Sequence, residues 1–205
     1  MDSAAAAFVA KSQGFEIIAL HFDYNQRTIN KEKQCFEQIC DDLGVSKKVI
    51  FNADFIAKIG GNSLTDKSLE IRKTGVKKDL PNSYVPFRNG IFLSIAAALA
   101  QKEGAKAIFI GVVQDDSSGY PDCSKEFITK INDAINEGCG EKFEIITPLV
   151  DLNKGEIVQK ALNLGVNLAH TWSCYESEIK PCGECDSCRL RAKGFSLANT
   201  KDPII

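Results

Sequence analysis

Short apolar runs alternate with longer segments of helical spacing along most of the chain. The runs with the length and content of buried strands are Glu16–His21, Lys48–Asn52, Ala107–Val113 and Phe143–Thr147. Apolar residues recur at helical spacing in Ile29–Leu43, Phe87–Lys102, Lys125–Glu137 and Asn153–Leu164. This order predicts an α/β fold, a doubly wound parallel sheet covered by helices, in which ligands bind beyond the carboxyl ends of the strands.

Residues at the segment ends predict where the helices begin and end. Gly44 follows the first helical segment and is typical of a C-terminal helix stop. Either Asp151 or Asn153 is expected to cap the last of these helices, which Gly165 ends. Pro86 lies just before the apolar helix, as is typical of a residue near the first helical position.

Two regions depart from the alternation. The chain opens with Met1, Asp2 and Ser3 and continues into a helix that no strand precedes. Because a helix N-terminus favours anions, Asp2 and Ser3 are expected either at an anion site or as a simple N-cap. The second region, residues 53–84, is too long for an ordinary connection and is interpreted as a lid or a mobile functional loop.

Composition limits the class of protein. The 205 residues, 44% of them hydrophobic, suffice for one domain with an ordinary core and a small appendage. The formal net charge of −2 argues against a broad nucleic-acid surface. No apolar run approaches the roughly 20 residues that span a bilayer. Free cysteines and the lack of a secretory signal predict a cytoplasmic protein with no membrane partner.

The strongest chemical signal is a group of four cysteines near the C-terminus. They are Cys174, Cys182, Cys185 and Cys188. Overlapping C-x2-C turns let three thiolates converge on one tetrahedral ion, and the preceding loop supplies the fourth. Structural zinc is the favoured interpretation. A redox-active pair and an iron–sulfur cluster remain alternatives, and a disulfide cluster is the usual explanation in small secreted proteins.

A cation at the start of the apolar helix is a further candidate for chemistry. Arg88 and Asn89 fall in its first turn, where a positive charge opposes the helix dipole. Arg88 is therefore expected to meet an anion, either a carboxylate of the protein or a phosphate of a ligand. The ligand is favoured because a bidentate guanidinium suits phosphate.

The loop after the clearest strand offers several polar side chains. Tyr120 and Asp122 are placed to hydrogen-bond a polar heterocycle, although a plain surface turn also explains their presence. Asp115 and Asp116 in the same loop either bind a metal or only solvate the loop.

Taken in order, these segments resemble one known family. They are D-S at a helix start, H-F-D-Y-N-Q-R, Y-V-P-F-R-N, G-V-V-Q-D-D-S-S-G-Y-P-D-C, T-W-S-C-Y and C-G-E-C-D-S-C-R-L-R-A-K-G-F. From Met1 to about Phe195, their order and spacing resemble the 7-cyano-7-deazaguanine synthases of queuosine biosynthesis. The resemblance implies an adenine-nucleotide α-hydrolase-like (HUP) fold, with a nucleotide-binding domain at residues 1–165, a zinc-binding segment at 166–205, and a homodimer.

The resemblance also implies an activity and residue roles. Such an enzyme converts 7-carboxy-7-deazaguanine, ammonia and ATP to the 7-nitrile through an adenylated acid and an adenylated amide, with Mg²⁺ on the pyrophosphate and a structural Zn²⁺. The implied roles are the pyrophosphate loop for Asp2 and Ser3, the adenosine side for His21 and Phe22, the reacting centre for Arg88 and Asn89, the deazapurine for Tyr120 and Asp122, and zinc for Cys174, Cys182, Cys185 and Cys188.

The chain departs from the family pattern at its beginning. The family carries a strand and an S-G-G-x-D-S loop, of which Met1, Asp2 and Ser3 match only the last three positions. Without the glycines, a backbone cradle cannot approach ATP phosphates closely. We therefore expect the natural chain to continue before Met1. An intact mass above the 22.4 kDa calculated for these residues would support this expectation.

Two other interpretations stay open. One is another ATP pyrophosphatase of the same fold, an amidotransferase or a tRNA-thiolating enzyme, with Cys123 as the candidate reactive thiol. The other is a non-catalytic, nucleotide-sensing zinc module. Pyrophosphate release with the carboxylated deazaguanine and ammonium separates the three.

Overall fold

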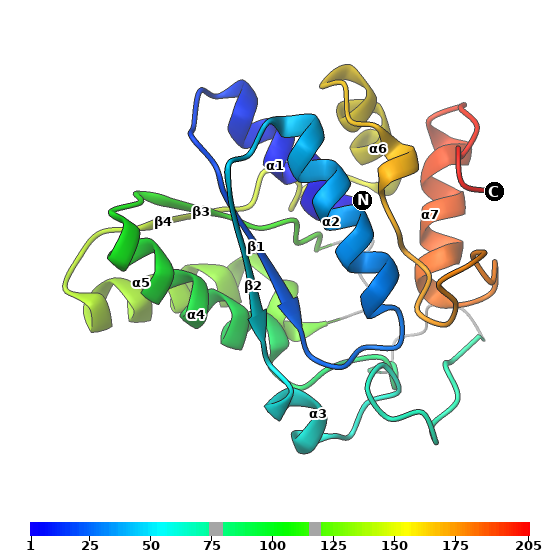
Figure 1. Ribbon diagram of the computed structural model, residues 1–205, viewed down its shortest axis with the longest axis horizontal. Coiled ribbons are helices and arrows are strands. Elements are labelled where there is room, and N and C mark those ends of the chain that lie inside the picture. Colours follow the sequence, from blue (N-terminus) through cyan, green and yellow to red (C-terminus); the bar gives the residue numbers. More distant parts are fainter. Residues whose placement is uncertain (74–79, 115–119) are drawn as a thin grey trace.

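In the computed structural model, the described residues are 1–73, 80–114 and 120–205. Helices and strands alternate along them much as the apolar pattern predicts (Figure 1). The helices are α1 (Asp2–Ser12), α2 (Ile29–Leu43), α3 (Phe55–Ile59), α4 (Arg88–Glu103), α5 (Lys125–Cys139), α6 (Lys154–Asn163) and α7 (Asp186–Leu197). The strands are β1 (Ile18–Asp23), β2 (Lys47–Asn52), β3 (Ala107–Phe109) and β4 (Glu144–Ile146). The acidic residues Asp115 and Asp116 lie outside the described residues.

The strands of the described residues form two parallel pairs. β1 pairs with β2 and β3 pairs with β4, so the α/β class with parallel strands is confirmed. The two pairs are not joined into one sheet by hydrogen bonds between described residues. Residues of β1 and of β3 instead line a common cavity that lies between the pairs.

β3 is shorter than its apolar run predicts, ending at Phe109 instead of Val113. Ile110 still donates to the Ile146 carbonyl at 3.1 Å, but the chain then passes closely against the start of α1. A Cβ placed on Gly111 would lie 2.6 Å from the Ser3 nitrogen. Glycine is therefore needed here. The contact holds the end of this strand against the N-terminus of α1.

The predicted helix stops are largely confirmed. α2 ends at Gly44 with φ 66°, and Gly165, just beyond α6, has φ 79°. The Asn153 side chain accepts from the backbone of Glu156, whose side chain accepts from Asn153 in return. Asn153 is therefore the cap of α6, and Asp151 instead pairs with Lys125 at 2.5 Å.

The start of α4 differs from the prediction in one respect. Pro86 lies outside the helix, and Phe87 is the N-cap, with φ 53° and ψ 27°. A bulky residue in the left-handed region is an outlier that the surroundings must hold in place. The Tyr84 hydroxyl accepts from the Phe87 nitrogen at 3.1 Å, and a Cβ on Gly90 would lie 2.4 Å from the Phe87 ring. Phe87 thus fixes the direction in which Arg88 leaves the turn.

The described part of the excursion at residues 53–84 is tethered to the body of the protein. It begins with α3 and continues in turns. Arg27 donates from Nε to the Ser63 carbonyl at 2.7 Å and from Nη2 to the Asp66 carbonyl at 2.9 Å. Arg72 pairs with the buried Asp186 of α7 at 3.5 Å. These contacts join the excursion to the β1–α2 loop and to α7.

The C-terminal segment packs on the rest of the molecule through the contact of its helix α7 with α6. A Cβ on Gly194 would lie 2.9 Å from the Lys154 carbonyl oxygen, and a Cβ on Gly155 would lie 2.6 Å from the Leu197 Cβ. The two glycines let the helices approach at nearly backbone contact. Among the described residues, no helix combines the length and apolar character needed to cross a membrane.

Candidate active site and metal centre

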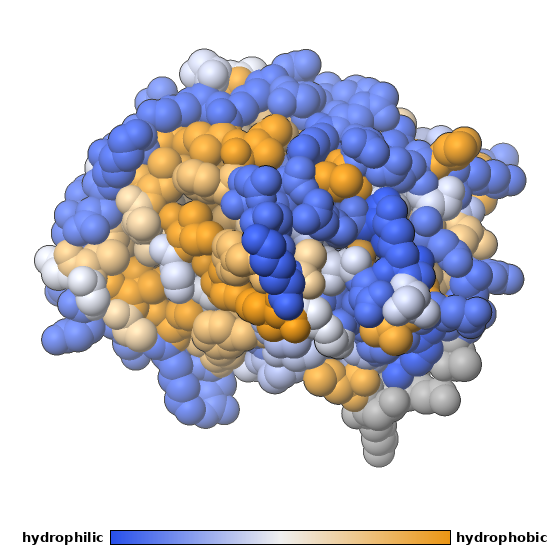
Figure 2. All heavy atoms as spheres, turned by 60° about the horizontal axis from the view of Figure 1, so that its bottom comes forward, coloured by the Kyte–Doolittle hydropathy of each residue, from blue (hydrophilic) through white to orange (hydrophobic). Residues whose placement is uncertain are grey.

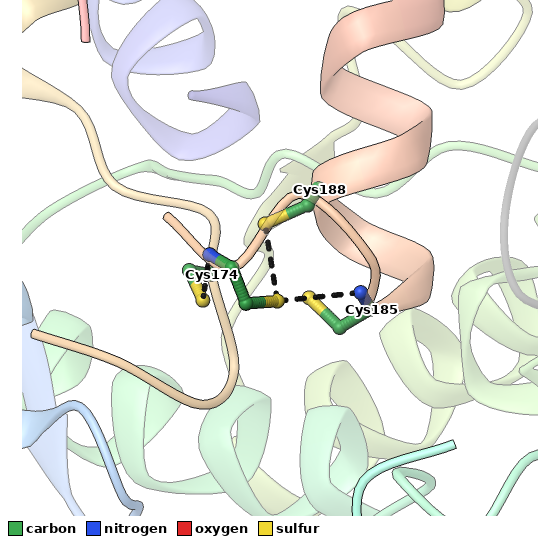
Figure 3. A group of neighbouring side chains, drawn as sticks. Cys174, Cys185 and Cys188 are labelled. Atoms are coloured by element: carbon green, nitrogen blue, oxygen red, sulfur yellow. Dashed lines mark hydrogen bonds between the residues drawn. The ribbon is translucent and has the colours of Figure 1, made fainter. Parts of the chain in front are cut away.

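The four C-terminal cysteines converge as their spacing predicts. The Sγ atoms of Cys174, Cys182, Cys185 and Cys188 all lie within 4.8 Å of one another. Cys174 lies in the extended segment that precedes the loop at residues 175–184, while Cys185 and Cys188 lie at the start of α7 (Figure 3). Cys174, Cys185 and Cys188 are at most 3% exposed, and all four thiols are free of disulfides.

The surroundings of these sulfurs suit thiolates bound to a cation. The backbone nitrogens of Glu176, Ser177 and Cys182 each donate to Cys174 Sγ at 3.4 Å. Gly183, with φ 76°, allows the tight turn between Cys182 and Cys185. Hydrogen bonds from the thiols of Cys185 and Cys188 lower the pKa of Cys174, which favours its thiolate form. Four thiolates leave no open coordination position, so a structural Zn²⁺ fits this donor set.

A cavity of about 720 Å³ lies next to this centre. Its lining brings together side chains that are far apart in the sequence, from α1, β1, α4, the loop before α5, α6 and the cysteine segment: Asp2, Ser3, His21, Phe22, Arg88, Asn89, Tyr120, Lys154, Cys174 and Tyr175. One zinc-ligand candidate thus contributes to the cavity wall. The metal centre and these candidates form one region, whereas the predicted substrate residue Asp122 does not line the cavity.

Arg88 faces this cavity from the first turn of α4 within an aromatic surround. Its Nη1 donates to the Tyr24 hydroxyl at 3.3 Å, and its guanidinium carbon lies 6.0 Å from the centroids of both Tyr24 and Phe92. Burial raises the pKa of Tyr24, and the guanidinium opposes that shift. Within the described part of the chain, no carboxylate lies within ion-pair distance of Arg88. The arrangement suits an anionic ligand.

Asn89 and Asp122 form a buried pair at the start of the same helix. The Asn89 backbone nitrogen donates to Asp122 Oδ2 at 2.9 Å, and Asn89 Nδ2 donates to the Asp122 carbonyl at 3.1 Å. Asp122 is 4% exposed. Its carboxylate therefore satisfies an end of α4 and complements the helix dipole. Asn89 Nδ2 also lies 3.3 Å from Cys123 Sγ, so both side chains already have protein partners.

Tyr120 lines the cavity beside α4 and contacts the end of the excursion. Its hydroxyl is 3.0 Å from Ser83 Oγ, and its ring is 5.5 Å from that of Tyr84. Because Ser83 and Tyr84 come from the excursion and Tyr120 from the loop before α5, this contact joins the two loops. Tyr175, directly after Cys174, lines the same wall.

Asp2 and Ser3 begin α1 at another part of the cavity. Asp2 Oδ2 pairs with Lys154 Nζ at 2.5 Å. Asp2 Oδ1 is buried and has no hydrogen-bond partner among the described residues. Ser3 is exposed, and neither side chain makes a cap hydrogen bond to α1. The simple N-cap interpretation therefore lacks its defining contact in this structure.

His21 and Phe22 lie on opposite faces of β1, as successive strand residues must. Phe22 stacks on Phe92 with ring centroids 3.9 Å apart, on the α4 side. His21 stacks on Phe36 of α2, with ring centroids 5.3 Å apart. Its Nε2 is buried without a hydrogen-bond partner among the described residues, and burial lowers the pKa of the imidazole. One planar ligand is therefore not expected to stack on both.

Sequence reasoning missed three residues of this region: Tyr24, Lys154 and Tyr175. Tyr24 and Tyr175 lie inside the recognised motifs H-F-D-Y-N-Q-R and T-W-S-C-Y. No sequence spacing predicts that these two aromatic side chains line the cavity around Arg88. Lys154 is the first residue of α6, where a cation is disfavoured by the helix dipole. That local conflict was the available signal.

Comparisons with known proteins find similar chains of one family. Residues 1–199 match the family described as queuosine biosynthesis protein QueC. The chain is 67% identical to a 7-cyano-7-deazaguanine synthase of Campylobacter hominis over 100% of this chain and 94% of the relative. It is 61% identical to that of Campylobacter concisus, covering 100% and 93%, and 55% identical to that of Aliarcobacter butzleri, covering 100% and 90%.

Proposed function

The chain belongs to the QueC family of queuosine biosynthesis proteins, and from this membership we propose which of its residues carry out the reaction. Its activity is that of a 7-cyano-7-deazaguanine synthase, an ATP-dependent ligase. The residue roles, the metal ions, the assembly and the compartment set out below are proposals. The observation that carries them is the convergence of Asp2, Arg88 and Tyr120 on one cavity walled by Cys174.

The chemistry requires activation of a carboxylate. In the proposed sequence, an oxygen of 7-carboxy-7-deazaguanine attacks the α-phosphate of ATP, and pyrophosphate leaves with the bonding electron pair. Ammonia displaces AMP to give an amide, losing one proton. The amide oxygen attacks a second ATP in the same way, and loss of AMP and two protons gives the nitrile. The protein must align these groups and neutralise developing charge.

Arg88 is the residue we assign to the reacting centre. It is a rigid, permanently charged donor, held by the Phe87 turn and by Tyr24. A guanidinium in an aromatic, partly desolvated setting stabilises phosphate or carboxylate more strongly than it would in water. Asn89 is proposed to lie near the substrate. Its hydrogen bonds to Asp122 also hold this turn in place.

Tyr120 and Asp122 are proposed to recognise the deazapurine, and His21 and Phe22 the adenosine. Tyr120 supplies a phenol and a ring at the cavity wall. The Asp122 carboxylate can accept further hydrogen bonds while it keeps the one from the Asn89 nitrogen. Its remaining lone pairs suit the amino and ring N–H donors of the deazapurine. Of the adenosine pair, the stacked Phe22–Phe92 rings offer the better aromatic surface.

Two metal ions are proposed. Zn²⁺ on the four cysteines would be structural and would hold the segment that carries Tyr175 against the cavity. Mg²⁺ would accompany the ATP phosphates, and Asp2, with its unpartnered Oδ1, is the residue in the cavity best suited to contact it.

A cytoplasmic homodimer is the proposed working form. β2 and the adjoining α3 expose Ile50, Phe55 and Ile59 at 42%, 41% and 60%. Figure 2 shows apolar side chains gathered over one half of a face, with hydrophilic side chains around them. Apolar surface of this kind is typical of interfaces between subunits. Light scattering coupled to size exclusion would give the mass of the assembly, and a monomer would contradict the proposal.

Thiolation by Cys123 is not favoured. Cys123 is 8% exposed, and burial together with the neighbouring Asp122 raises its pKa to about 11. A reactive thiol needs a lowered pKa and access to the ligand.

The test is a turnover assay with 7-carboxy-7-deazaguanine, ammonium, ATP and Mg²⁺. We expect release of AMP and pyrophosphate, two of each per nitrile formed, with the amide as an intermediate in mass spectra. Pyrophosphate release without a deazapurine product would contradict the proposed substrate. Nitrile formation that did not depend on Arg88 would contradict the residue assignment alone.

A further inference from the structure

Asp186 is a buried carboxylate placed among the clustered cysteines. It is the first residue of α7, lies between Cys185 and Cys188, and is 1% exposed. Neither of its oxygens accepts a hydrogen bond from the described residues. A carboxylate at a helix start complements the helix dipole at an exposed position as well, and burying a charge is costly without a partner. Helix stability therefore does not explain why this side chain is buried.

The cation that meets Asp186 comes from the excursion at residues 53–84. Arg72 Nε lies 3.5 Å from Asp186 Oδ2, and the arginine side chain is 13% exposed. The preceding residue, Ile71, is 5% exposed and belongs to the same buried apolar cluster as Cys185. A buried ion pair is a weak source of stability compared with packed apolar side chains, but it can specify one geometry between the segments that it joins.

A second set of contacts holds the next residue of the excursion. Lys73 Nζ pairs with Glu176 Oε2 at 2.9 Å and with Glu184 Oε2 at 3.3 Å. Arg189 of α7 donates from Nη2 to the Lys73 carbonyl at 3.2 Å and from Nε to the Glu184 carbonyl at 2.7 Å. Two consecutive residues of the excursion are thus bound by the cysteine segment, residues 174–188, and by the helix that follows it. The Lys73 side chain is 41% exposed, so its pairs contribute less than a buried pair does.

The same part of the excursion reaches the cavity through Asn82 and Ser83. Asn82 Oδ1 accepts from the Arg72 nitrogen at 3.4 Å, and Asn82 Nδ2 donates to the Glu70 carbonyl at 2.8 Å. The adjacent Ser83 is 3% exposed, and its hydroxyl oxygen lies 3.0 Å from that of Tyr120, which lines the cavity. A continuous set of contacts therefore leads from Arg72 to Tyr120.

We propose that Arg72 and Asp186 are positioning residues, through which the cysteine segment holds Tyr120 at the deazapurine. This inference rests on the proposed function, which assigns Tyr120 to that substrate. Neither Arg72 nor Asp186 is among the described residues that line the cavity, so they act through the position of Asn82 and Ser83. The effect falls on binding of the deazapurine, whereas the nucleotide at the start of α1 is little affected.

The experiment compares Arg72→Met with Lys67→Met, a matched control that removes an exposed cation of the same excursion, in the purified zinc-loaded protein. Steady-state assays measure KM for the deazapurine and for ATP, and hydrogen exchange measures the protection of residues 60–73. We expect Arg72→Met to raise KM for the deazapurine about tenfold, the loss typical of one misplaced hydrogen bond, while KM for ATP stays close to that of wild type. Exchange at residues 60–73 should become faster at unchanged zinc content. Arg72→Lys, which keeps the charge, should restore KM toward wild type, and Lys67→Met should change none of these quantities.

A double-mutant cycle with Asp186→Asn tests whether the two residues act as a pair. In the zinc-loaded protein, the double variant should raise KM for the deazapurine no further than Arg72→Met alone, because each change breaks the same contact. Increases in KM that multiply in the double variant would overturn the inference.

A purely structural ion pair predicts a different pattern. Both accounts predict a lower melting temperature for Arg72→Met, because a buried carboxylate loses its cation. With a purely structural role, KM for the deazapurine would stay at the wild-type value or rise equally with KM for ATP, and either result would overturn the inference. If Arg72→Met does not fold, Arg72→Gln decides by the same criteria, because its side chain keeps polar donors without the charge. A wild-type protein that forms no nitrile would instead contradict the proposed function.

Discussion

Arg191 and Asp202 form a two-point ion pair that fixes the C-terminal tail to α7. Arg191 Nε donates to Asp202 Oδ2 at 2.7 Å and Arg191 Nη2 donates to Oδ1 at 2.9 Å. The side chains are 2% and 7% exposed. The same guanidinium donates to the Thr171 hydroxyl at 2.8 Å and to the Leu168 carbonyl at 3.1 Å. One arginine thus joins the tail, α7 and the segment that leads into the cysteine cluster.

Removing one partner of this pair should be costly. Asp202→Ala leaves a buried guanidinium without its carboxylate, and we expect a loss of about 3 kcal/mol in the free energy of unfolding. Urea denaturation measures it. Asp151→Ala, which removes the exposed Lys125–Asp151 pair, is the control and should cost less than about 1 kcal/mol. Equal losses in the two variants would show that the tail is not held by this pair.

Arg88→Ala should impair turnover without unfolding the protein. The guanidinium contacts the Tyr24 hydroxyl and the rings of Tyr24 and Phe92 but no carboxylate among the described residues, so its removal leaves no buried carboxylate of that set unpaired. We expect kcat/KM for ATP to fall about 100-fold, while the melting temperature changes little. Lys102→Ala, at the other end of α4 and 78% exposed, is the matched control. Unchanged turnover in Arg88→Ala would remove this residue from the reacting centre.

Cys185→Ser should lower zinc content and thermal stability together. Cys185 is fully buried and lies within 4.8 Å of the other cluster sulfurs, so the change leaves three thiolates and a weaker ligand. Metal analysis and thermal melting measure the two effects. Cys139→Ser, at the end of α5 and outside the cluster, should change neither. If turnover fell in Cys185→Ser while metal and melting temperature held, a redox role would replace the structural one.

Glu178 links the cysteine loop to α2 in a manner that depends on pH. Its Oε1 accepts from the backbone nitrogens of Asn30 at 2.8 Å and Lys31 at 3.4 Å, and its Oε2 accepts from Asn30 Nδ2. The Asn30 side chain and these backbone donors lower the pKa of Glu178. Because the folded pKa is lower than the unfolded value of about 4.3, the stabilisation is complete above that pH and is lost as pH falls through the folded pKa.

The corresponding measurement is the pH dependence of stability for Glu178→Gln. Glutamine keeps an acceptor but does not titrate, so the acid limb of the stability curve should become shallower below about pH 4.3. At neutral pH the variant should be slightly less stable, because a charged group at the start of α2 is lost. An acid limb identical to that of wild type would show that Glu178 does not couple the loop to the helix.

Much of the fold was predictable because its signals are local. α2 begins and ends at the residues that the spacing and Gly44 predict, and three of the four cysteines converge because overlapping C-x2-C turns fix their separation. β3 was predicted too long, since an apolar run does not reveal that Gly111 must pass against α1. A cation in the first turn of a helix opposes the helix dipole, and this marked Arg88 as a candidate from the sequence. The structure shows no carboxylate of the described residues paired with it. The same argument applied to Lys154, and only the structure brought it beside Asp2.

The part of the site that sequence reasoning does not settle is the role of Asp122. If Asp122 acts mainly as the cap of α4, Asp122→Asn should keep an acceptor for the Asn89 nitrogen and cost little stability, whereas Asp122→Ala should cost about 1–2 kcal/mol. If Asp122 also binds the deazapurine, Asp122→Asn should raise KM for that substrate at least tenfold while KM for ATP stays unchanged. Urea denaturation of both variants, with KM measured for both substrates, separates the two effects. Equal increases in both KM values would indicate that Asp122 acts through the position of Arg88, because the proposed site places both substrates at the turn that Asn89 and Asp122 hold.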